Sequence, residues 1–276
     1  MHLIPFLLYA ASAIAYAAHF SRRDPRAGRA ATAILTAAAL AHTFLIGMQR
    51  MQAGYMPFSG TPAAISFFVW LLALAYLYTE LSSDERAMGV FVTPLIAVLQ
   101  LIPTIDVPAF GARPAVLASP LFALHVSSLL FAYASFALAC MIGVTYVLLF
   151  KEIKAKHLGY FYARLPSLAV LDRMNMKAIT VGWTFLTLGV VIGGVWALQA
   201  DFRSSSDPRA QAMTMMDPKI FVALVCWLLY SFALFVRRAT GWGARRSAWL
   251  SAIGFLLVLL NFVPVGYFLT KSHNFF

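Results

Sequence analysis

The fold class follows from one long apolar stretch, residues 121–150, with the sequence LFALHVSSLLFAYASFALACMIGVTYVLLF. This segment contains no Lys, Arg, Asp or Glu. About 20 consecutive apolar residues in an α-helix are enough to cross the hydrocarbon core of a lipid bilayer. A backbone inside the bilayer must also satisfy its own hydrogen bonds, and one segment achieves this only as a helix. The segment therefore predicts a transmembrane helix.

The rest of the chain has the same character. Hydrophobic residues make up 62% of the 276 residues and charged residues only 11%, whereas a typical soluble domain is roughly 25% charged. This excess of apolar surface excludes secreted enzymes, cytosolic enzymes and disordered chains. Seven further apolar runs lie at 2–20, 31–49, 62–80, 87–105, 178–200, 219–237 and 247–269. We predict an all-α integral membrane protein, a bundle of about eight transmembrane helices that forms a single polytopic membrane domain over 1–276.

The basic residues are distributed unevenly between the two sides of this predicted bundle. Fifteen of the 21 Lys and Arg residues fall in the loops after the first, third, fifth and seventh runs. Because cytoplasmic loops carry an excess of Lys and Arg, these loops are expected on the cytoplasmic side. Both termini then face the outer, periplasmic side. This topology accounts for most of the net charge of +11, so the lipid bilayer is the expected partner and nucleic acid is not.

Two loops and one glycine pair have further predicted roles. Residues 151–177, on the inner side, mix apolar and charged side chains and are expected to lie at the membrane interface as an amphipathic stretch. Residues 201–218 form the longest outer loop between the late spans, polar at first and then Met-rich. Gly189 and Gly193 share one helix face, and this spacing predicts close packing against a neighbouring helix.

Familiar catalytic patterns are absent from the sequence. It has no P-loop, no dinucleotide-binding glycine motif, no zinc-protease motif and no CxxC thiol pair. We therefore do not expect an enzyme in its own right. Glu80 and Asp106 are acids near span ends, and both are expected to reach the interface. The lack of acids near the membrane midplane weakens the case for a proton-coupled transporter.

The histidines are the main candidates for chemistry. His42 lies about 17 Å from the inner end of its span at 1.5 Å rise per residue, where a polar ring needs a partner. Its partner is either a neighbouring helix or the iron of a metal or haem site. His125 and His273 both fall on the predicted outer side, and two imidazoles from opposite faces commonly hold haem iron. His2, at the N-terminus, is expected to be solvated.

An ordered series of short motifs runs from about Tyr55 to the end of the chain. The motifs are His125-Val126-Ser127-Ser128 followed by Tyr133, Leu171-Asp172-Arg173-Met174-Asn175-Met176-Lys177, Gly193-Gly194-Val195-Trp196-Ala197, Asp217-Pro218-Lys219 followed by Trp227, and Gly241-Trp242-Gly243-Ala244-Arg245-Arg246. In this order they resemble the cytochrome c assembly superfamily of haem-handling membrane proteins, which includes the CcsA, CcmC and HemX-like groups.

The resemblance implies a function in cytochrome c biogenesis. It implies a multi-pass protein of the bacterial cytoplasmic membrane that binds haem b at its outer face and presents it for attachment to apocytochrome c, with a second assembly subunit in the membrane as partner. His125 and His273 would be the iron ligands, His42 a further candidate ligand, and 201–218 the equivalent of the family's haem-platform loop. The other candidate haem-binding residues are Trp196, Arg203, Arg209, Asp217 and Lys219.

Two departures from the family pattern leave alternatives open. The stretch from Gln199 to Asp217 contains no tryptophan, although the family loop carries several. Phe235 stands eight residues after Trp227, where members with a second, intramembrane haem carry a histidine. The alternatives are a HemX-like, non-catalytic regulator of haem biosynthesis and a small-molecule transporter without haem.

Overall fold

The computed structural model describes residues 1–58, 60–108, 119–156, 159–199, 218–241 and 243–260, and in these ranges every regular element is an α-helix. The helices are α1 (Leu3–Arg22), α2 (Pro25–Ala53), α3 (Thr61–Ser83), α4 (Gly89–Ile105), α5 (Pro120–Lys154), α6 (Leu168–Gln199), α8 (Pro218–Thr240) and α9 (Ala244–Leu260). Six of them, α1, α2, α3, α5, α6 and α8, are long and apolar enough to cross a membrane, and α4 is a shorter apolar helix. The protein is a multi-pass helical membrane protein, as the composition predicts.

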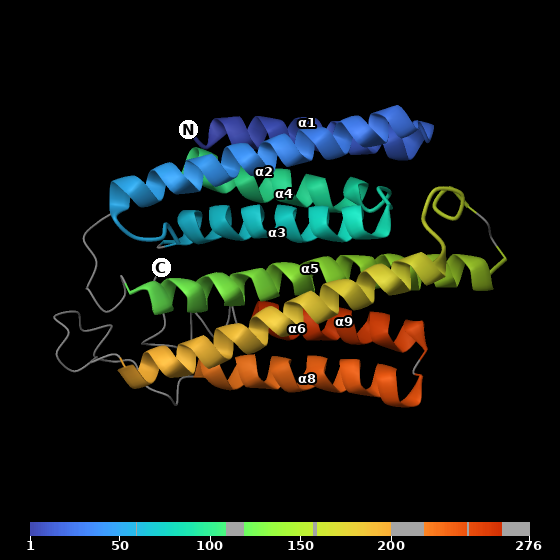
Figure 1. Ribbon diagram of the computed structural model, residues 1–276. Helices are drawn as coiled ribbons and strands as arrows, with labels where there is room; N and C mark the ends of the chain where they lie inside the picture. Colours follow the sequence, from blue (N-terminus) through green and yellow to red (C-terminus); the bar gives the residue numbers. More distant parts are fainter. Residues whose placement is uncertain (59, 109–118, 157–158, 200–217, 242, 261–276) are drawn as a thin grey trace.

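The helices lie side by side in one elongated bundle (Figure 1). Helices α1 to α4 form one half, and α5, α6, α8 and α9 form the other. Helix α5 lies between the halves, where it packs against α3 on one side and against α6 and α9 on the other. It is also the most enclosed of the long apolar helices, since 72% of its most hydrophobic window is buried. This is the helix formed by the stretch that predicts the fold.

Helix ends coincide with local sequence signals. Asp24 precedes α2 and accepts a hydrogen bond from the backbone N–H of Arg26 at 2.9 Å, with Pro25 in the first turn. Ser119 caps α5 in the same way, accepting from the N–H of Phe122 at 3.1 Å. Such side-chain caps satisfy N–H groups that have no partner within the helix. Gly54 follows α2 with φ +76°, a conformation that glycine adopts without steric cost.

The charged residues divide the bundle into two ends. All fifteen predicted inner cations lie at the end where α1 joins α2, α3 joins α4, α5 leads to α6 and α8 joins α9. We call this the basic end. The opposite end, which we call the His125 end, carries the first turns of α5 and the last turns of α6. Among the described residues its Lys and Arg side chains are Arg50 and Lys219.

The inner segment 151–177 is more helical than its charge suggests. Helix α5 continues to Lys154 and α6 already begins at Leu168, so 155–167 is the part between the two helices. The early start of α6 is explained by neighbouring helices, because Asp172 on its first turns forms an ion pair with Arg237 of α8. Lys177 likewise donates to the backbone oxygen of Ser82 at 2.6 Å. Charges that suggest a loop are here partnered between helices.

Aromatic residues in the 155–167 segment pack onto the other half of the bundle. The ring of Phe161 lies 6.4 Å from that of Phe20 on α1 and 6.4 Å from that of Phe91 on α4, measured between centroids. Arg164 stacks over the ring of Tyr160 at 3.8 Å and donates to the backbone oxygen of Ser21 at 3.3 Å. The segment therefore connects the two halves at the basic end.

Candidate functional site

His125 lies in the second turn of α5, directly against two glycines of α6. Its Nδ1 donates a hydrogen bond to the backbone oxygen of Gly189 at 2.7 Å. A Cβ atom added to Gly193 would come within 2.4 Å of the same Nδ1, and one added to Gly189 within 2.7 Å of Leu129. The predicted close packing of this glycine pair is confirmed, and its partner is α5. A larger residue at position 193 would displace the imidazole.

Two aromatic side chains pack beside the His125 ring. Trp196 lies one turn after Gly193 and is 6% exposed. Its ring is nearly parallel to the imidazole, with an interplanar angle of 20° and a centroid distance of 6.4 Å. Phe122 packs on Trp196 at 5.0 Å between centroids. The hydrogen bond to Gly189 and the indole together hold the imidazole in one orientation.

This geometry determines which nitrogen of His125 can bind a metal. The oxygen of Gly189 can only accept, so Nδ1 carries the proton in the hydrogen bond. In the neutral ring the metal-binding lone pair is then on Nε2. Histidines that ligate metals typically donate their other ring N–H to a carbonyl or carboxylate, which sets the tautomer and the ring orientation. His125 has the arrangement expected of an axial ligand.

The other predicted residues of the outer site are placed only in part. Lys219 is in the first turn of α8 at the His125 end, because α8 begins at Pro218. Arg203, Arg209, Asp217 and His273 lie outside the described residues, as does the 201–218 loop up to Pro218. The structure therefore places His125, Trp196 and the first turn of α8 at the same end of the bundle.

His42 is enclosed in the other half of the molecule. It is 0% exposed, and both ring nitrogens take part in hydrogen bonds. Nδ1 is 3.1 Å from the hydroxyl of Tyr9 on α1, and Nε2 is 2.9 Å from that of Ser66 on α3. This arrangement favours the helix-to-helix hydrogen bond over the iron ligand, since no ring nitrogen is left over for a metal.

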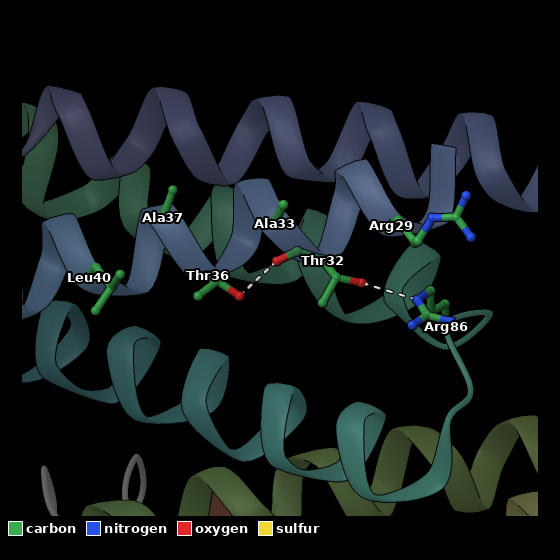
Figure 2. Close-up of a pocket in the computed structure, with 7 residues that line it drawn as sticks. All are labelled: Arg29, Thr32, Ala33, Thr36, Ala37, Leu40 and Arg86. Atoms are coloured by element: carbon green, nitrogen blue, oxygen red, sulfur yellow. Dashed lines mark hydrogen bonds between the residues drawn. The ribbon is translucent and has the colours of Figure 1, made fainter. Parts of the chain in front are cut away.

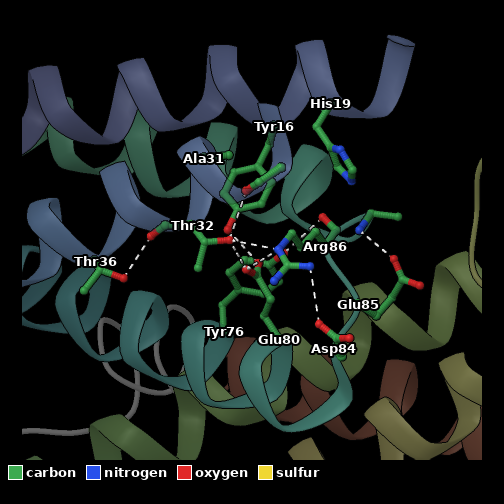
Figure 3. A network of polar contacts seen from close by, with 12 residues as sticks. Tyr16, His19, Ala31, Thr32, Thr36, Tyr76, Glu80, Asp84, Glu85 and Arg86 are labelled. Carbon is green, nitrogen blue, oxygen red and sulfur yellow. Dashed lines mark hydrogen bonds and ion pairs between the residues drawn. The ribbon is translucent and has the colours of Figure 1, made fainter. Parts of the chain in front are cut away.

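Two expectations about polar residues are wrong. His2 is not solvated: it is 3% exposed, and its Nε2 lies 2.8 Å from the side-chain nitrogen of Gln49 on α2. Glu80 is not exposed at the interface: its side chain is 1% exposed at the basic end. The hydroxyls of Tyr16 and Thr32 donate to its two oxygens at 2.6 and 2.5 Å, and Arg86 lies 3.9 Å away (Figure 3). In both cases, side chains from neighbouring helices satisfy the buried group in place of water.

These buried contacts follow a spacing that our sequence analysis missed. His2, Tyr9 and Tyr16 recur every seven residues on α1, and His42 and Gln49 are seven apart on α2. Residues seven apart lie on one face of a helix, two turns from each other. Helices α1 to α4 therefore meet through polar layers, around His2, around His42 and around Glu80. In the described part of the chain, no three His, Cys, Asp or Glu side chains are grouped so that they could hold a metal ion.

Comparison with known proteins identifies the family. A family model described as cytochrome c assembly protein matches residues 58–273. The chain is 25% identical over 252 residues to the cytochrome c biogenesis protein CcsA of Guillardia theta, covering 84% of this chain and 81% of that protein. It is 24% identical to the protein of the same name from Trieres chinensis, with 84% and 81% coverage. The CcsA protein of Chlorella vulgaris is 26% identical, with 81% and 78% coverage. The chain belongs to the cytochrome c assembly protein family.

Proposed function

We propose that this protein binds haem at the His125 end and presents it for attachment to apocytochrome c during cytochrome c biogenesis. The observation that carries the proposal is the hydrogen bond from His125 Nδ1 to Gly189, because it assigns the ligating lone pair to Nε2. The family match and the CcsA relatives, named as cytochrome c biogenesis proteins, support the pathway. Haem b is the proposed form, and a second assembly subunit in the membrane the proposed partner.

The residues have distinct roles in this proposal. His125 and His273 are the axial ligands, and the 201–218 loop covers the haem. Arg203, Arg209 and Lys219 pair with the propionates, since Arg in particular suits a carboxylate, and Asp217 is a further residue of the haem site. Nε2 of His125 would hold the iron, and Trp196, nearly parallel to the imidazole, would keep that ring in its orientation.

We also propose the full membrane topology. Helices α4 and α9 have 17 described residues each, which is near the lower limit of about 17 for a span. With them the bundle has eight spans, and both termini lie on the outer side of the bacterial cytoplasmic membrane. The basic end then faces the cytoplasm, as the excess of Lys and Arg supports. Segment 151–177 would lie at the inner interface.

Haem content of the purified protein tests the ligand assignment. The wild-type protein in detergent is expected to show a Soret band and, when reduced, α and β bands. His125→Ala and His273→Ala should each lose haem or change the spectrum, and added imidazole should restore it because it fills the open coordination site. His42→Ala is the matched control and should keep the spectrum. A colourless wild-type protein would instead support the regulator or the transporter without haem.

Two exposed positions at opposite ends test the topology. In a background with Cys140→Ala and Cys226→Ala, we would compare Met51→Cys with Asp84→Cys, whose native side chains are 86% and 88% exposed. A membrane-impermeant maleimide added to intact cells with a permeable outer membrane should label position 51 only. Position 84 should react only after lysis. The reverse pattern would overturn the proposed orientation.

A further inference from the structure

A groove runs along the outward face of α2 near the basic end (Figure 2). It has a volume of about 460 Å³ and is lined by α2 side chains from Arg29 to Leu40 and by Arg86, which follows α3. The groove is not part of the His125 site, which lies at the opposite end of the bundle. Cationic side chains line one end of the groove, and small or apolar side chains line the remainder.

The polar end of the groove holds two guanidinium groups. Arg86 is held in place, because its Nε donates to the hydroxyl of Thr32 at 3.3 Å and lies 3.9 Å from Glu80, and its Nη1 pairs with the exposed Asp84 at 3.3 Å (Figure 3). Glu80 is itself held by Tyr16 and Thr32, so the guanidinium position is set by a buried network. Arg29 is exposed and forms no ion pair with any described residue. The positive charge of Arg29 is therefore uncompensated at the mouth of the groove.

The remainder of the groove is lined by small and apolar side chains. Ala33, Thr36 and Ala37 are exposed on α2, and Leu40 is 66% exposed. The hydroxyl of Thr36 donates to the backbone oxygen of Thr32 at 2.8 Å, so it does not need an external partner. Small side chains in this row leave the space that the groove occupies. Since α2 is apolar and long enough to span a membrane, an exposed face of this helix would contact lipid.

The length of the groove matches one leaflet. Arg29 and Leu40 are eleven residues apart, which corresponds to about 17 Å along the helix axis. Half of a hydrocarbon core of about 30 Å is about 15 Å. The cations lie at the basic end, where lipid headgroups would be, and the apolar part extends toward the middle of the bundle. An acyl chain attached to an anionic headgroup has these proportions.

We propose that the groove binds an anionic phospholipid of the leaflet at the basic end. The phosphate lies between Arg29 and Arg86, and one acyl chain lies along Ala33, Ala37 and Leu40. Guanidinium groups form paired hydrogen bonds with phosphate oxygens, which makes arginine well suited to this contact. The bound lipid covers this exposed face of α2 and neutralises Arg29.

Lipid binding to the purified full-length protein tests the proposal. The delipidated protein in detergent is titrated with phosphatidylglycerol or with phosphatidylcholine, and the bound lipids are counted by native mass spectrometry. One tightly bound phosphatidylglycerol is expected per chain, and phosphatidylcholine should bind more weakly. Inorganic phosphate at the same concentration should not compete, because it lacks the acyl chain. Full competition by phosphate would mean that the apolar groove plays no part.

Three variants separate the groove from general attraction to a basic surface. Arg29→Gln is expected to weaken phosphatidylglycerol binding about fivefold, as for one cation at an anionic surface. The double variant Ala33→Leu with Ala37→Leu should lose the tight site although every charge remains. Arg22→Gln, exposed at the same end but outside the groove, should bind like the wild type. Equal losses in Arg22→Gln and Arg29→Gln, or retained binding in the double variant, would overturn the proposal.

Discussion

His42 and His125 are two histidines in different halves of the bundle, and the groups that contact their rings differ. His42 is enclosed by α1, α2 and α3, and hydroxyls of Tyr9 and Ser66 occupy both ring nitrogens. His125 contacts a backbone oxygen through one nitrogen, and the space for its ring is made by Gly193. Side-chain hydroxyls at both nitrogens favour a structural role for His42. At His125 the bond to a backbone oxygen sets the tautomer and the ring orientation, as in histidines that ligate metals.

The contacts around the two histidines also differ in what holds the helices together. Around His42, side-chain hydrogen bonds join α2 to α1 and α3. Around His125, Gly189 and Gly193 let α5 and α6 approach closely, because a Cβ at either position would lie within 2.7 Å of a side chain of α5. Both halves contain polar contacts between helices, such as Trp183 Nε1 donating to the hydroxyl of Ser231 at 2.7 Å in the second half. Substitutions should therefore act differently at the two histidine sites.

The largest expected effect is at Gly193. Gly193→Leu should abolish haem binding, since even a Cβ would lie 2.4 Å from His125 Nδ1. Overpacking of this kind also costs about 1–3 kcal/mol of stability. Gly194→Leu is the matched control, because a Cβ there meets no atom within 4 Å, and it should keep both haem and melting temperature. Absorbance spectra and thermal melts of the two variants check this. Equal behaviour of the two would contradict the role assigned to Gly193.

At His42 we expect an effect on stability alone, with haem binding retained. His42→Ala leaves the hydroxyls of Tyr9 and Ser66 without their partner in a buried position, which costs about 3 kcal/mol in total. His125→Ala should cost much less stability. The oxygen of Gly189 lies inside α6 and still accepts the backbone hydrogen bond of that helix when the imidazole is removed. Melting temperatures and haem content measured on both variants separate the two effects. Loss of haem in His42→Ala without a lower melting temperature would make His42 a ligand.

The sequence predicts most of the fold because lipid dictates the length and polarity of each span. Each of the eight apolar runs overlaps one described helix. The predicted apolar run begins at residue 178, but α6 begins at Leu168. The charges of Asp172 and Lys177 suggest a loop, whereas both side chains have partners on α8 and α3. A charged residue therefore indicates a helix end only when no neighbouring helix offers it a partner.

The sequence predicts the close packing of the glycines at the candidate site, but not which side chains are buried against them. The spacing of Gly189 and Gly193 predicts close packing, but not that the imidazole of His125 fills the gap. Glu80 and His2 lie near span ends, which suggests solvent, and only the helices packed around them show that they are buried. Such contacts join residues far apart in the chain, and local patterns do not contain them.

The smallest expected changes in stability are at two tyrosines of α1, which occupy equivalent positions in successive polar layers. Tyr9→Phe removes one hydrogen bond to the imidazole of His42 and should cost about 1 kcal/mol. Tyr16→Phe removes a bond to the buried Glu80 and should cost about 2 kcal/mol, because bonds to charged groups are stronger. Each variant keeps its ring, so the edge-on contacts of Tyr9 with His42 and of Tyr16 with Tyr76 remain. Thermal melts of both variants should show the larger decrease for Tyr16→Phe, with haem binding unchanged in either. An equal or reversed order would contradict the stronger hydrogen bond assigned to Tyr16.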